Sequence, residues 1–449
     1  MHIIVIICDT LRRDYVGAYG NEWIRTPNMD ALAQASTVFD RALIGSFPTI
    51  PQRAELMTGH HVFHTTGWAP LEPSEVPFQN LLKEQGYVNA MITDNVQYMA
   101  PGMNYHQGFD AYRYIRGHQA DRCWSWHDRP EWPCDPNKLR QPEMLVIPHL
   151  SNARGRRFER EWHDPMTVQT ALDWLEDNYR QEQFALYLDL FGIHEPWDPP
   201  QYYMDLYADP DYAGDPIILP RYDHSDYASA DEVRDIRARY AAMVTMTDHW
   251  IGRLIDKLQL MGIWDDAAIL FTSDHGWYHG EHGYLGKHTV VEPEIGWPLY
   301  HTVSRVPLFL KVPGIDGGER SHALVQPVDI APTLMELGGA TPPQGLHGRS
   351  LVPVVRGEAS SIRDLAISAP RLSTDPNVRV CNSVSDGEWT LIDKGPVGDP
   401  ELYHWPSDPD QLSDLAADEP DVVQRLRAAY RQYLVDIGTS QDRLAARAL

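Results

Sequence analysis

The first apolar run of the chain places the strongest constraint on its fold. Residues 2–8 read HIIVIIC, an almost unbroken series of β-branched and apolar side chains, and Asp9 follows directly. A strand that is apolar at successive positions has both faces buried, as in the middle of a parallel sheet covered by helices on both sides. The carboxylate that follows such a strand lies at the edge where sheets of this kind bind their ligands.

The same pattern recurs along the chain, with helices between the strands. Strand-like runs occur at 88–93, 184–190, 267–272 and 306–312. Helical patterns lie among them at 77–86, 166–180, 232–260 and 329–338, and TPN at 26–28 is typical of a helix start. This alternation predicts an α/β fold with a doubly wound, mostly parallel central sheet flanked by helices.

Two stretches depart from the alternation. Residues from about 101 to 160 are rich in Trp, Tyr, Arg and Pro, which indicates an insertion that forms either a pocket wall or a subunit interface. Residues 380–395 resemble a hairpin, and 420–434 have the pattern of an amphipathic helix. We therefore predict a large α/β domain over 1–355 and a small C-terminal domain of antiparallel sheet and helix over 356–449.

The charge balance narrows the class of partner. The chain has 63 acidic and 38 basic residues and a formal net charge of −25, which opposes binding to nucleic acid. No apolar run approaches the roughly 20 residues that cross a bilayer, and the first residues lack the basic start and cleavage site of a signal peptide. We expect a cytoplasmic protein with a small-molecule substrate and no membrane contact. A homo-oligomer is compatible with the sequence, which leaves the oligomeric state open.

Three separated stretches carry groups that could hold a metal ion. Asp9 follows the first strand, Asp274 and His275 follow the run at 267–272, and FPTIPQRAELMTG at 47–59 reads as a turn and a short helix that carry Thr49. Each stretch alone is more typical of a helix cap or a polar turn. At one edge of a sheet, however, carboxylates and an imidazole predict a site for one divalent cation.

Together these stretches resemble the sulfatase branch of the alkaline phosphatase superfamily. The resemblance extends over nearly the whole chain in the family's order. It is carried by DTLRRDYVGAYGN at 9–21, TPNMDALA at 26–33, SDHG at 273–276, LGKH at 285–288, VDIAPTLMELGG at 328–339, LHGRSLVP at 346–353 and ELYHWPSDPDQLSDLA at 401–416.

The resemblance implies a metal site and a nucleophile. Asp9, Asp274 and His275 match metal ligands of the family. Thr49 occupies the place of the nucleophile in the family's Cys-x-Pro-x-Arg motif, where it would also contact the metal.

The resemblance also implies three groups that bind the substrate and take part in catalysis. Arg53, the arginine of the same motif, would hold the nucleophile and an oxygen of the transferring group, because a guanidinium suits an oxyanion. His194, in GIHEP at 192–196, matches a histidine that contacts the substrate and protonates the leaving oxygen. Lys287 matches a lysine that neutralises charge on the transferring group.

Three positions depart from the family pattern. Thr10 stands where many sulfatases have a second acidic residue, and His275 stands where they commonly have asparagine with calcium. An imidazole ligand favours Mn²⁺ or Zn²⁺ over Ca²⁺. Residues 90–96, AMITDNV, lack the lysine and histidine of the family's Gly-Lys-Trp-His element.

The nucleophile is the largest departure. Sulfatases convert a cysteine or serine to formylglycine, and threonine is not a known substrate of that conversion, whereas related phosphodiesterases use threonine directly. SDHG with LGK also resembles the phosphonate monoester hydrolases of the superfamily. We therefore expect a metal-dependent hydrolase of phosphate diesters or phosphonate monoesters, with in-line attack by Thr49.

Three alternatives remain open. The first is an arylsulfatase-like sulfuric ester hydrolase that uses unmodified Thr49. The second is an inactive scaffold that binds a sulfated or phosphorylated ligand. The third is a transferase that passes the phosphoryl group to an alcohol.

Overall fold

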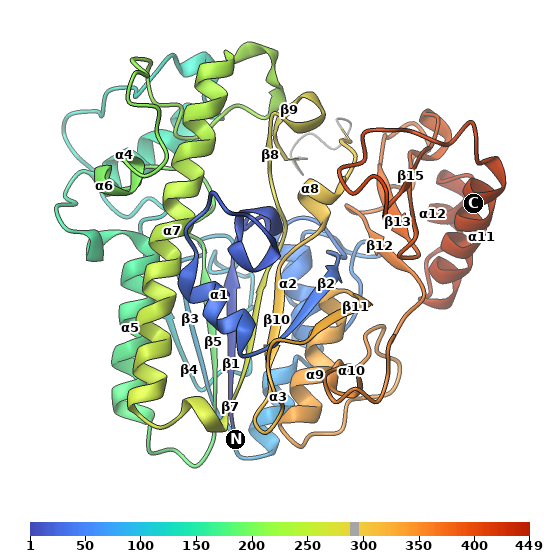
Figure 1. Cartoon of the computed structure of the whole chain (residues 1–449), viewed down its shortest axis with the longest axis horizontal. Coiled ribbons are helices and arrows are strands. Elements are labelled where there is room, and N and C mark those ends of the chain that lie inside the picture. Colours follow the sequence, from blue (N-terminus) through green and yellow to red (C-terminus); the bar gives the residue numbers. More distant parts are fainter. Residues whose placement is uncertain (288–295) are drawn as a thin grey trace.

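The computed structural model, which describes residues 1–287 and 296–449, is built around an eight-stranded sheet (Figure 1). The strand order is β11-β2-β10-β7-β1-β5-β3-β4. β10 runs antiparallel to both of its neighbours, and the other pairs are parallel. The predicted, mostly parallel sheet is therefore confirmed. Its strands are β1 His2–Cys8, β2 Thr37–Ala42, β3 Val88–Thr93, β4 Ala111–Tyr114, β5 Phe184–Leu190, β7 Ala267–Ser273, β10 Leu308–Lys311 and β11 Arg320–Val325.

Strand β1 lies inside the sheet with both faces buried, as its sequence predicts. Ile4 and Ile6 belong to one hydrophobic cluster, whereas Ile3 and Val5 belong to another on the opposite face. Helices cover both faces (Figure 1). The first cluster includes residues of α1 Pro27–Gln34, α5 His163–Asn178 and α7 Ala230–Leu260, and the second includes residues of α2 Thr49–Thr58, α3 Phe78–Glu84 and α9 Ile330–Leu337.

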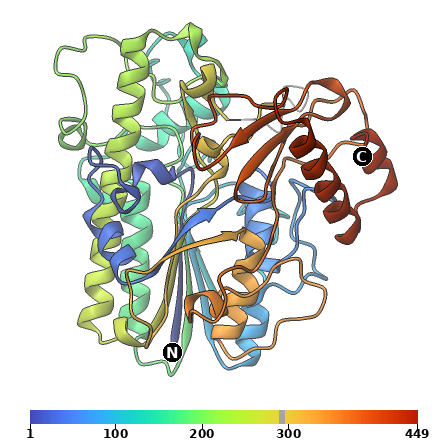
Figure 2. The ribbon, with the colours of Figure 1, turned by 45° about the vertical axis from the view of Figure 1, so that its right-hand side comes forward.

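The C-terminal part of the chain forms a second sheet, with the strand order β12-β13-β14-β15 and antiparallel pairing throughout. Figure 2 shows this sheet and its helices beside the large sheet. The predicted hairpin and closing helix are confirmed, and the domain boundary at 355 stays a prediction. The elements are β12 Ala366–Ser368, β13 Asn382–Ser385, β14 Trp389–Asp393, β15 Glu401–His404, α11 Pro420–Asp436 and α12 Gln441–Ala446.

The segment at 101–160 is only partly an insertion. Its residues Ala111–Tyr114 form β4, which pairs with β3 at the edge of the large sheet. The sequence AYRY there is mostly exposed, so it lacks the apolar run of a buried strand. Further along, Arg116, Trp124 and Trp126 line a cavity of about 390 Å³. The role of this part, as a wall of the substrate pocket or as a subunit interface, stays a prediction.

Short elements complete the described fold. A small third sheet has the order β6-β9-β8. None of the helices in the described part of the chain is long and apolar enough to span a bilayer. The cytoplasmic location stays a prediction. The short elements are β6 Asp223–His224, β8 Tyr278–His279, β9 Tyr284–Gly286, α4 Ile147–Ala153, α6 Gln201–Met204, α8 His301–Ser304 and α10 Val352–Val355.

Candidate active site

Thr49 is the first residue of α2, and only 1% of it is exposed. A helix N-terminus carries unpaired N–H groups and a positive partial charge, which favour an anion beside it. The helix is short because Gly59 ends it in a left-handed conformation, with φ at 75°. The local sequence therefore places a buried hydroxyl at the positive end of a helix, as the motif predicts.

Asp9 and Asp274 lie side by side because their strands are neighbours. β1 and β7 run parallel, with Cys8 opposite Ser273, so the next residue of each strand emerges at the same carboxyl edge. The ligand atoms of Asp9, Asp274 and His275 all lie within 4.8 Å of one another, and all three residues are buried. The three predicted metal ligands are thus brought together.

The hydrogen-bond partner of Nδ1 decides which ring nitrogen of His275 carries the hydrogen. Nδ1 lies 3.0 Å from the carbonyl oxygen of Gly276, which can only accept, so Nδ1 carries the hydrogen. Nε2 then has its lone pair available, 3.4 Å from Thr49 Oγ1 and 3.4 Å from Asp274 Oδ2. Burial lowers the pKa of His275 to about 3. A neutral imidazole with a free nitrogen is the form that ligates a metal.

The two carboxylates are also arranged to receive a cation. Asp274 Oδ1 accepts the backbone N–H groups of Thr10 and His275, each at 2.8 Å, which fixes its orientation. Asp9 Oδ2 is buried and accepts no hydrogen bond. Burial and the charge of Asp274 raise the pKa of Asp9. Two adjacent carboxylates and a neutral imidazole fit a divalent cation.

Arg53 follows Thr49 by one helical turn and packs against the same group of acids. Its Nε and Nη2 donate to the two carboxylate oxygens of Asp189, each at 2.9 Å. Its Nη1 donates to Asp274 Oδ2, and Nη2 lies 3.1 Å from Asp9 Oδ2. All four groups are fully buried. The position of Arg53 is therefore set by Asp189 and by the candidate metal ligands.

Asp189 is a site residue that the sequence analysis missed. It lies in β5, opposite Ile7 of β1. Its signal in the sequence is a single carboxylate within FALYLDL, the run of a strand buried on both faces. A buried charge needs a partner, so this residue could have been matched with the buried arginine of the nucleophile motif.

His194 lies in the loop after β5. Its Nδ1 lies 2.7 Å from the carbonyl oxygen of Glu195 and must donate to it, so in the neutral ring Nε2 carries the lone pair. The ring stacks on Phe191 with centroids 4.3 Å apart. Burial first, and then the charge of Lys287, lower the pKa of His194 well below its usual range. His194 is therefore neutral and close to Lys287.

Lys287 and Thr10 complete the site. Lys287 Nζ donates to Thr10 Oγ1 at 3.2 Å, and Thr10 Oγ1 donates to Asp9 Oδ1 at 2.7 Å. Thr10 has φ at 64°, which is rare for a β-branched residue. The residue that replaces the family's second acid thus links the lysine to the candidate metal ligand. His288, the next residue of the LGKH motif, lies outside the described residues.

The model of the sulfatase family matches residues 1–340, and the model of the N-sulphoglucosamine sulphohydrolase C-terminal region matches residues 280–437. Arylsulfatase K of Rattus norvegicus is 23% identical over 473 residues, which cover 96% of this chain and 78% of that protein. The multifunctional alkaline phosphatase superfamily protein PehA of Trinickia caryophylli is 24% identical over 485 residues, which cover 93% and 91%.

Solved structures agree with the family model. The phosphonate monoester hydrolase of Agrobacterium radiobacter superposes with a TM-score of 0.76 at 22% identity, covering 97% of this chain and 96% of that one. This likeness shows the fold, and the sulfatase model matches well over half of the chain. The chain is therefore a hydrolase of the sulfatase family, within the alkaline phosphatase superfamily.

Proposed function

We propose that this protein is a metal-dependent hydrolase of phosphate diesters or phosphonate monoesters, with Thr49 as its nucleophile. The observation that carries the proposal is the identity and place of Thr49, a hydroxyl at the N-terminus of α2 with Oγ1 3.4 Å from His275 Nε2. An unmodified hydroxyl can attack phosphorus to form an ester, and water can then hydrolyse that ester. The likeness to a phosphonate monoester hydrolase over 97% of the chain supports the same class.

Asp9, Asp274, His275 and Thr49 would hold the cation. The imidazole among these ligands favours Mn²⁺ or Zn²⁺ over Ca²⁺. A bound divalent cation supplies charge that lowers the pKa of an adjacent hydroxyl and offsets negative charge on the transferring group.

In the first step, Thr49 Oγ1 forms a bond to phosphorus as the bond from phosphorus to the leaving oxygen breaks. The hydroxyl proton of Thr49 passes to solvent, and the electron pair of the broken bond stays on the leaving oxygen. Arg53 and Lys287 balance charge on the non-bridging oxygens, since both are buried cations at the site. The anionic substrate favours the protonated form of His194, whose Nε2 then gives its proton to the leaving oxygen.

In the second step, water attacks phosphorus and Thr49 is released. His194, now neutral with Nδ1 held by the carbonyl of Glu195, accepts a proton from this water at Nε2. Thr49 Oγ1 leaves with the electron pair of its bond to phosphorus and takes a proton from solvent. The hydroxyl of Thr49 is restored, and His194 returns to the protonated form that it takes in the substrate complex.

A sulfuric ester hydrolase is the second candidate. It is favoured by the likeness to arylsulfatase K and by the sulphohydrolase model that matches residues 280–437. Such an enzyme would have to hydrolyse a threonine sulfate ester without the aldehyde of formylglycine. We therefore rank it below phosphoryl transfer. The inactive scaffold ranks lower still, because Arg53, His194 and Lys287 are all buried beside the candidate metal ligands. No feature of the site favours the transferase.

The test is a parallel measurement of kcat/KM on an aryl phosphate diester, an aryl phosphonate monoester and an aryl sulfate, with Mn²⁺, Zn²⁺ or Ca²⁺ added to metal-free protein. We expect a phosphorus ester to be the best substrate. Faster turnover of the aryl sulfate would overturn the proposal in favour of the second candidate. Background rates on all three esters, unchanged in Thr49→Ala, would favour the scaffold.

A further inference from the structure

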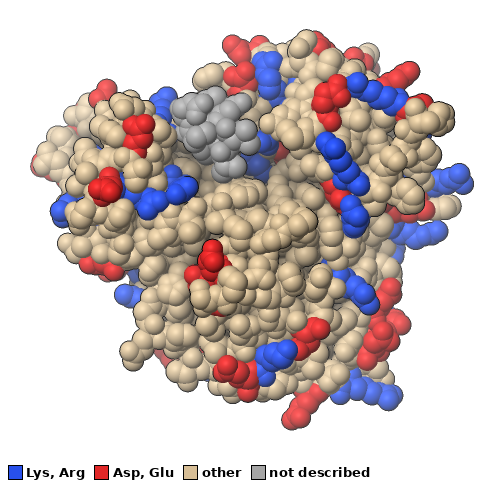
Figure 3. Space-filling model, turned by 180° about the vertical axis from the view of Figure 1, so that it is seen from behind, with Lys and Arg blue, Asp and Glu red and all other residues tan. Residues whose placement is uncertain are grey.

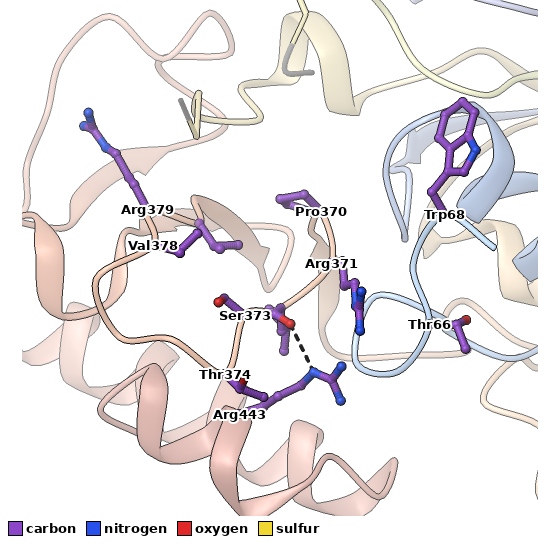
Figure 4. Close-up of a pocket in the computed structure, with 11 residues that line it drawn as sticks. Thr66, Trp68, Pro370, Arg371, Ser373, Thr374, Val378, Arg379 and Arg443 are labelled. Carbon is purple, nitrogen blue, oxygen red and sulfur yellow. Dashed lines mark hydrogen bonds between the residues drawn. The ribbon is translucent and has the colours of Figure 1, made fainter. Parts of the chain in front are cut away.

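A cavity of about 560 Å³ lies between the loop after α2 and the C-terminal part of the chain (Figure 4). Thr66 and Trp68 line it from the loop, and Arg443 lines it from α12. The remaining wall comes from two pieces of the segment between β12 and β13, at 370–374 and 378–380. None of the residues discussed for the active site lines this cavity.

The cavity is basic although the chain is acidic. Arg371, Arg379 and Arg443 line it, and no lining residue is acidic, in a chain with a net charge of −25. Among the described residues, none of these three arginines forms an ion pair with a carboxylate within 4.0 Å. Arg371 and Arg379 are exposed, whereas Arg443 is partly buried. In the described part of the chain, no carboxylate within 4.0 Å offsets the positive charge of these three arginines.

Two of these arginines face each other. Figure 4 shows the guanidinium groups of Arg371 and Arg443 close together, whereas Arg379 points outward from the other side. Arg443 is held in place, because Nε donates to the carbonyl of Leu372 at 3.0 Å and Nη2 donates to the carbonyl of Thr65 at 2.8 Å. Burial and the charge of Arg371 lower the pKa of Arg443. An anion between the two guanidinium groups would relieve this repulsion.

We propose that this cavity is a second, non-catalytic site that binds a small oxyanion of the sulfate or phosphate type. The forked donors of Arg371 suit such an oxyanion, and Arg443 can add its charge and the N–H groups of Nη1, since its Nε and Nη2 already donate to backbone carbonyls. The hydroxyls of Ser373 and Thr66 add neutral donors to the lining of the cavity. Trp68 is 36% exposed and lines the same cavity, where it provides a flat apolar surface for a group attached to the anion.

The site is connected to the nucleophile through a short path. The carbonyl of Ala369 accepts the N–H of Phe47 at 2.9 Å, so the segment that bears Arg371 is tied to the loop that bears Thr49. Arg371 lies two residues after Ala369, and Thr49 lies two residues after Phe47. At no more than about 3.6 Å per residue, the Cα atoms of Arg371 and Thr49 are therefore within about 20 Å of each other. The oxyanion therefore comes either from free sulfate or phosphate in solution or from a second anionic group on the substrate.

The first experiment measures binding of inorganic sulfate and phosphate by equilibrium dialysis at constant ionic strength. Arg371→Gln removes the charge but keeps the first part of the side chain, which packs against Gly67. We expect Arg371→Gln to lose at least tenfold in affinity at one class of site. Arg25→Gln, which removes the same charge from an exposed arginine before α1, is expected to bind like the wild type. Equal binding by Arg371→Gln and the wild type would overturn the proposal.

The second experiment identifies the source of the anion. It compares two aryl phosphate diesters, one of which carries an additional sulfonate on its leaving group. A roughly tenfold higher KM of Arg371→Gln for the sulfonated ester alone, with kcat unchanged, assigns the site to the substrate. Unchanged KM values together with lost sulfate binding assign it to a free anion. The binding experiment decides the proposal even if neither ester is hydrolysed, so its failure is distinct from failure of the proposed function.

Discussion

Arg53 and Asp189 form a two-point ion pair inside the protein, in which Nε and Nη2 of the arginine donate to the two oxygens of the carboxylate, each at 2.9 Å. The pair leaves Nη1 directed at Asp274 and 3.4 Å from the carbonyl of Thr49. Asp189 thereby orients the arginine that pairs with both candidate metal carboxylates, Asp9 and Asp274. It is a positioning residue, since its own oxygens point to the guanidinium.

Asp189→Asn should lower kcat by about 10- to 100-fold, because an amide keeps the shape but offers only one acceptor to Arg53. In a variant that already carries Arg53→Lys, adding Asp189→Asn should lower kcat little further, since the two residues act as a unit. The measurements are kcat, KM and the urea midpoint of each variant. Asp128→Asn, in an exposed ion pair with Arg154, is the control. Additive losses from Asp189→Asn and Arg53→Lys would contradict the positioning role.

Thr49→Ala should lower kcat by roughly 10⁴-fold or more, because no other hydroxyl occupies the start of α2. Thr49→Ser keeps the hydroxyl and should retain activity within about 10²-fold of the wild type. Thr58→Ala, at the other end of the same helix, controls for helix stability. An active Thr49→Ala variant would assign the nucleophile to water or to another residue.

Removal of metal by a chelator should abolish turnover and lower the melting temperature, since the carboxylates of Asp9 and Asp274 would then repel each other. Mn²⁺ or Zn²⁺ should restore activity better than Ca²⁺. His275→Asn should move the preference toward Ca²⁺, because an amide oxygen replaces the imidazole nitrogen. Metal affinity measured by calorimetry provides a readout apart from activity. His224→Asn, an exposed histidine, is the control. An unchanged metal ranking in His275→Asn would show that His275 is not a ligand.

Acid should destabilise the protein through histidines that are buried in the neutral form. Burial, and then the charge of Arg305, lower the pKa of His301 to about 3, against about 6.5 in an unfolded chain. The neutral ring lies 3.3 Å from the carbonyl of Pro409 and 3.2 Å from Thr390 Oγ1. Below pH 6.5 the unfolded state binds a proton that the folded state does not, so stability is present above that pH and is lost as the pH falls.

His301→Gln should therefore flatten the pH dependence of the free energy of unfolding between pH 6.5 and pH 4. The difference in slope from the wild type should reach at most about 1.4 kcal/mol per pH unit. Urea titrations at pH 7, 6 and 5 measure it. His127→Gln changes a side chain that is 93% exposed and should leave the slope as in the wild type. Equal slopes for His301→Gln and the wild type would show that His301 does not contribute.

The central part of the fold could be predicted because its strands are buried on both faces. β1, β3 and β5 begin and end at the predicted residues, since each is a short apolar run with a clear boundary. β10 is shorter than the predicted 306–312, and its antiparallel direction leaves no trace in its own sequence. β4 was missed because an exposed edge strand does not need apolar residues.

The candidate site could be predicted in part for a similar reason. Its metal ligands and nucleophile follow strands or start a helix, where polar residues stand out from their surroundings. Asp189 was missed because it lies inside a strand, where the apolar neighbours determine the pattern and a single carboxylate does not change it. The role of Thr10 as a link between Lys287 and Asp9 depends on a backbone conformation with φ at 64°, which the sequence does not reveal.

The role of Thr49 as nucleophile is tested by identifying the covalent intermediate on its side chain. Protein mixed with an aryl phosphonate monoester is quenched in acid within one turnover, digested and analysed by mass spectrometry. We expect a phosphonyl group at Thr49, on the peptide that contains residues 47–59. It should form and decay at the turnover rate and should be absent from Thr49→Ala. Turnover without any adduct on this peptide would contradict the role of Thr49 as nucleophile.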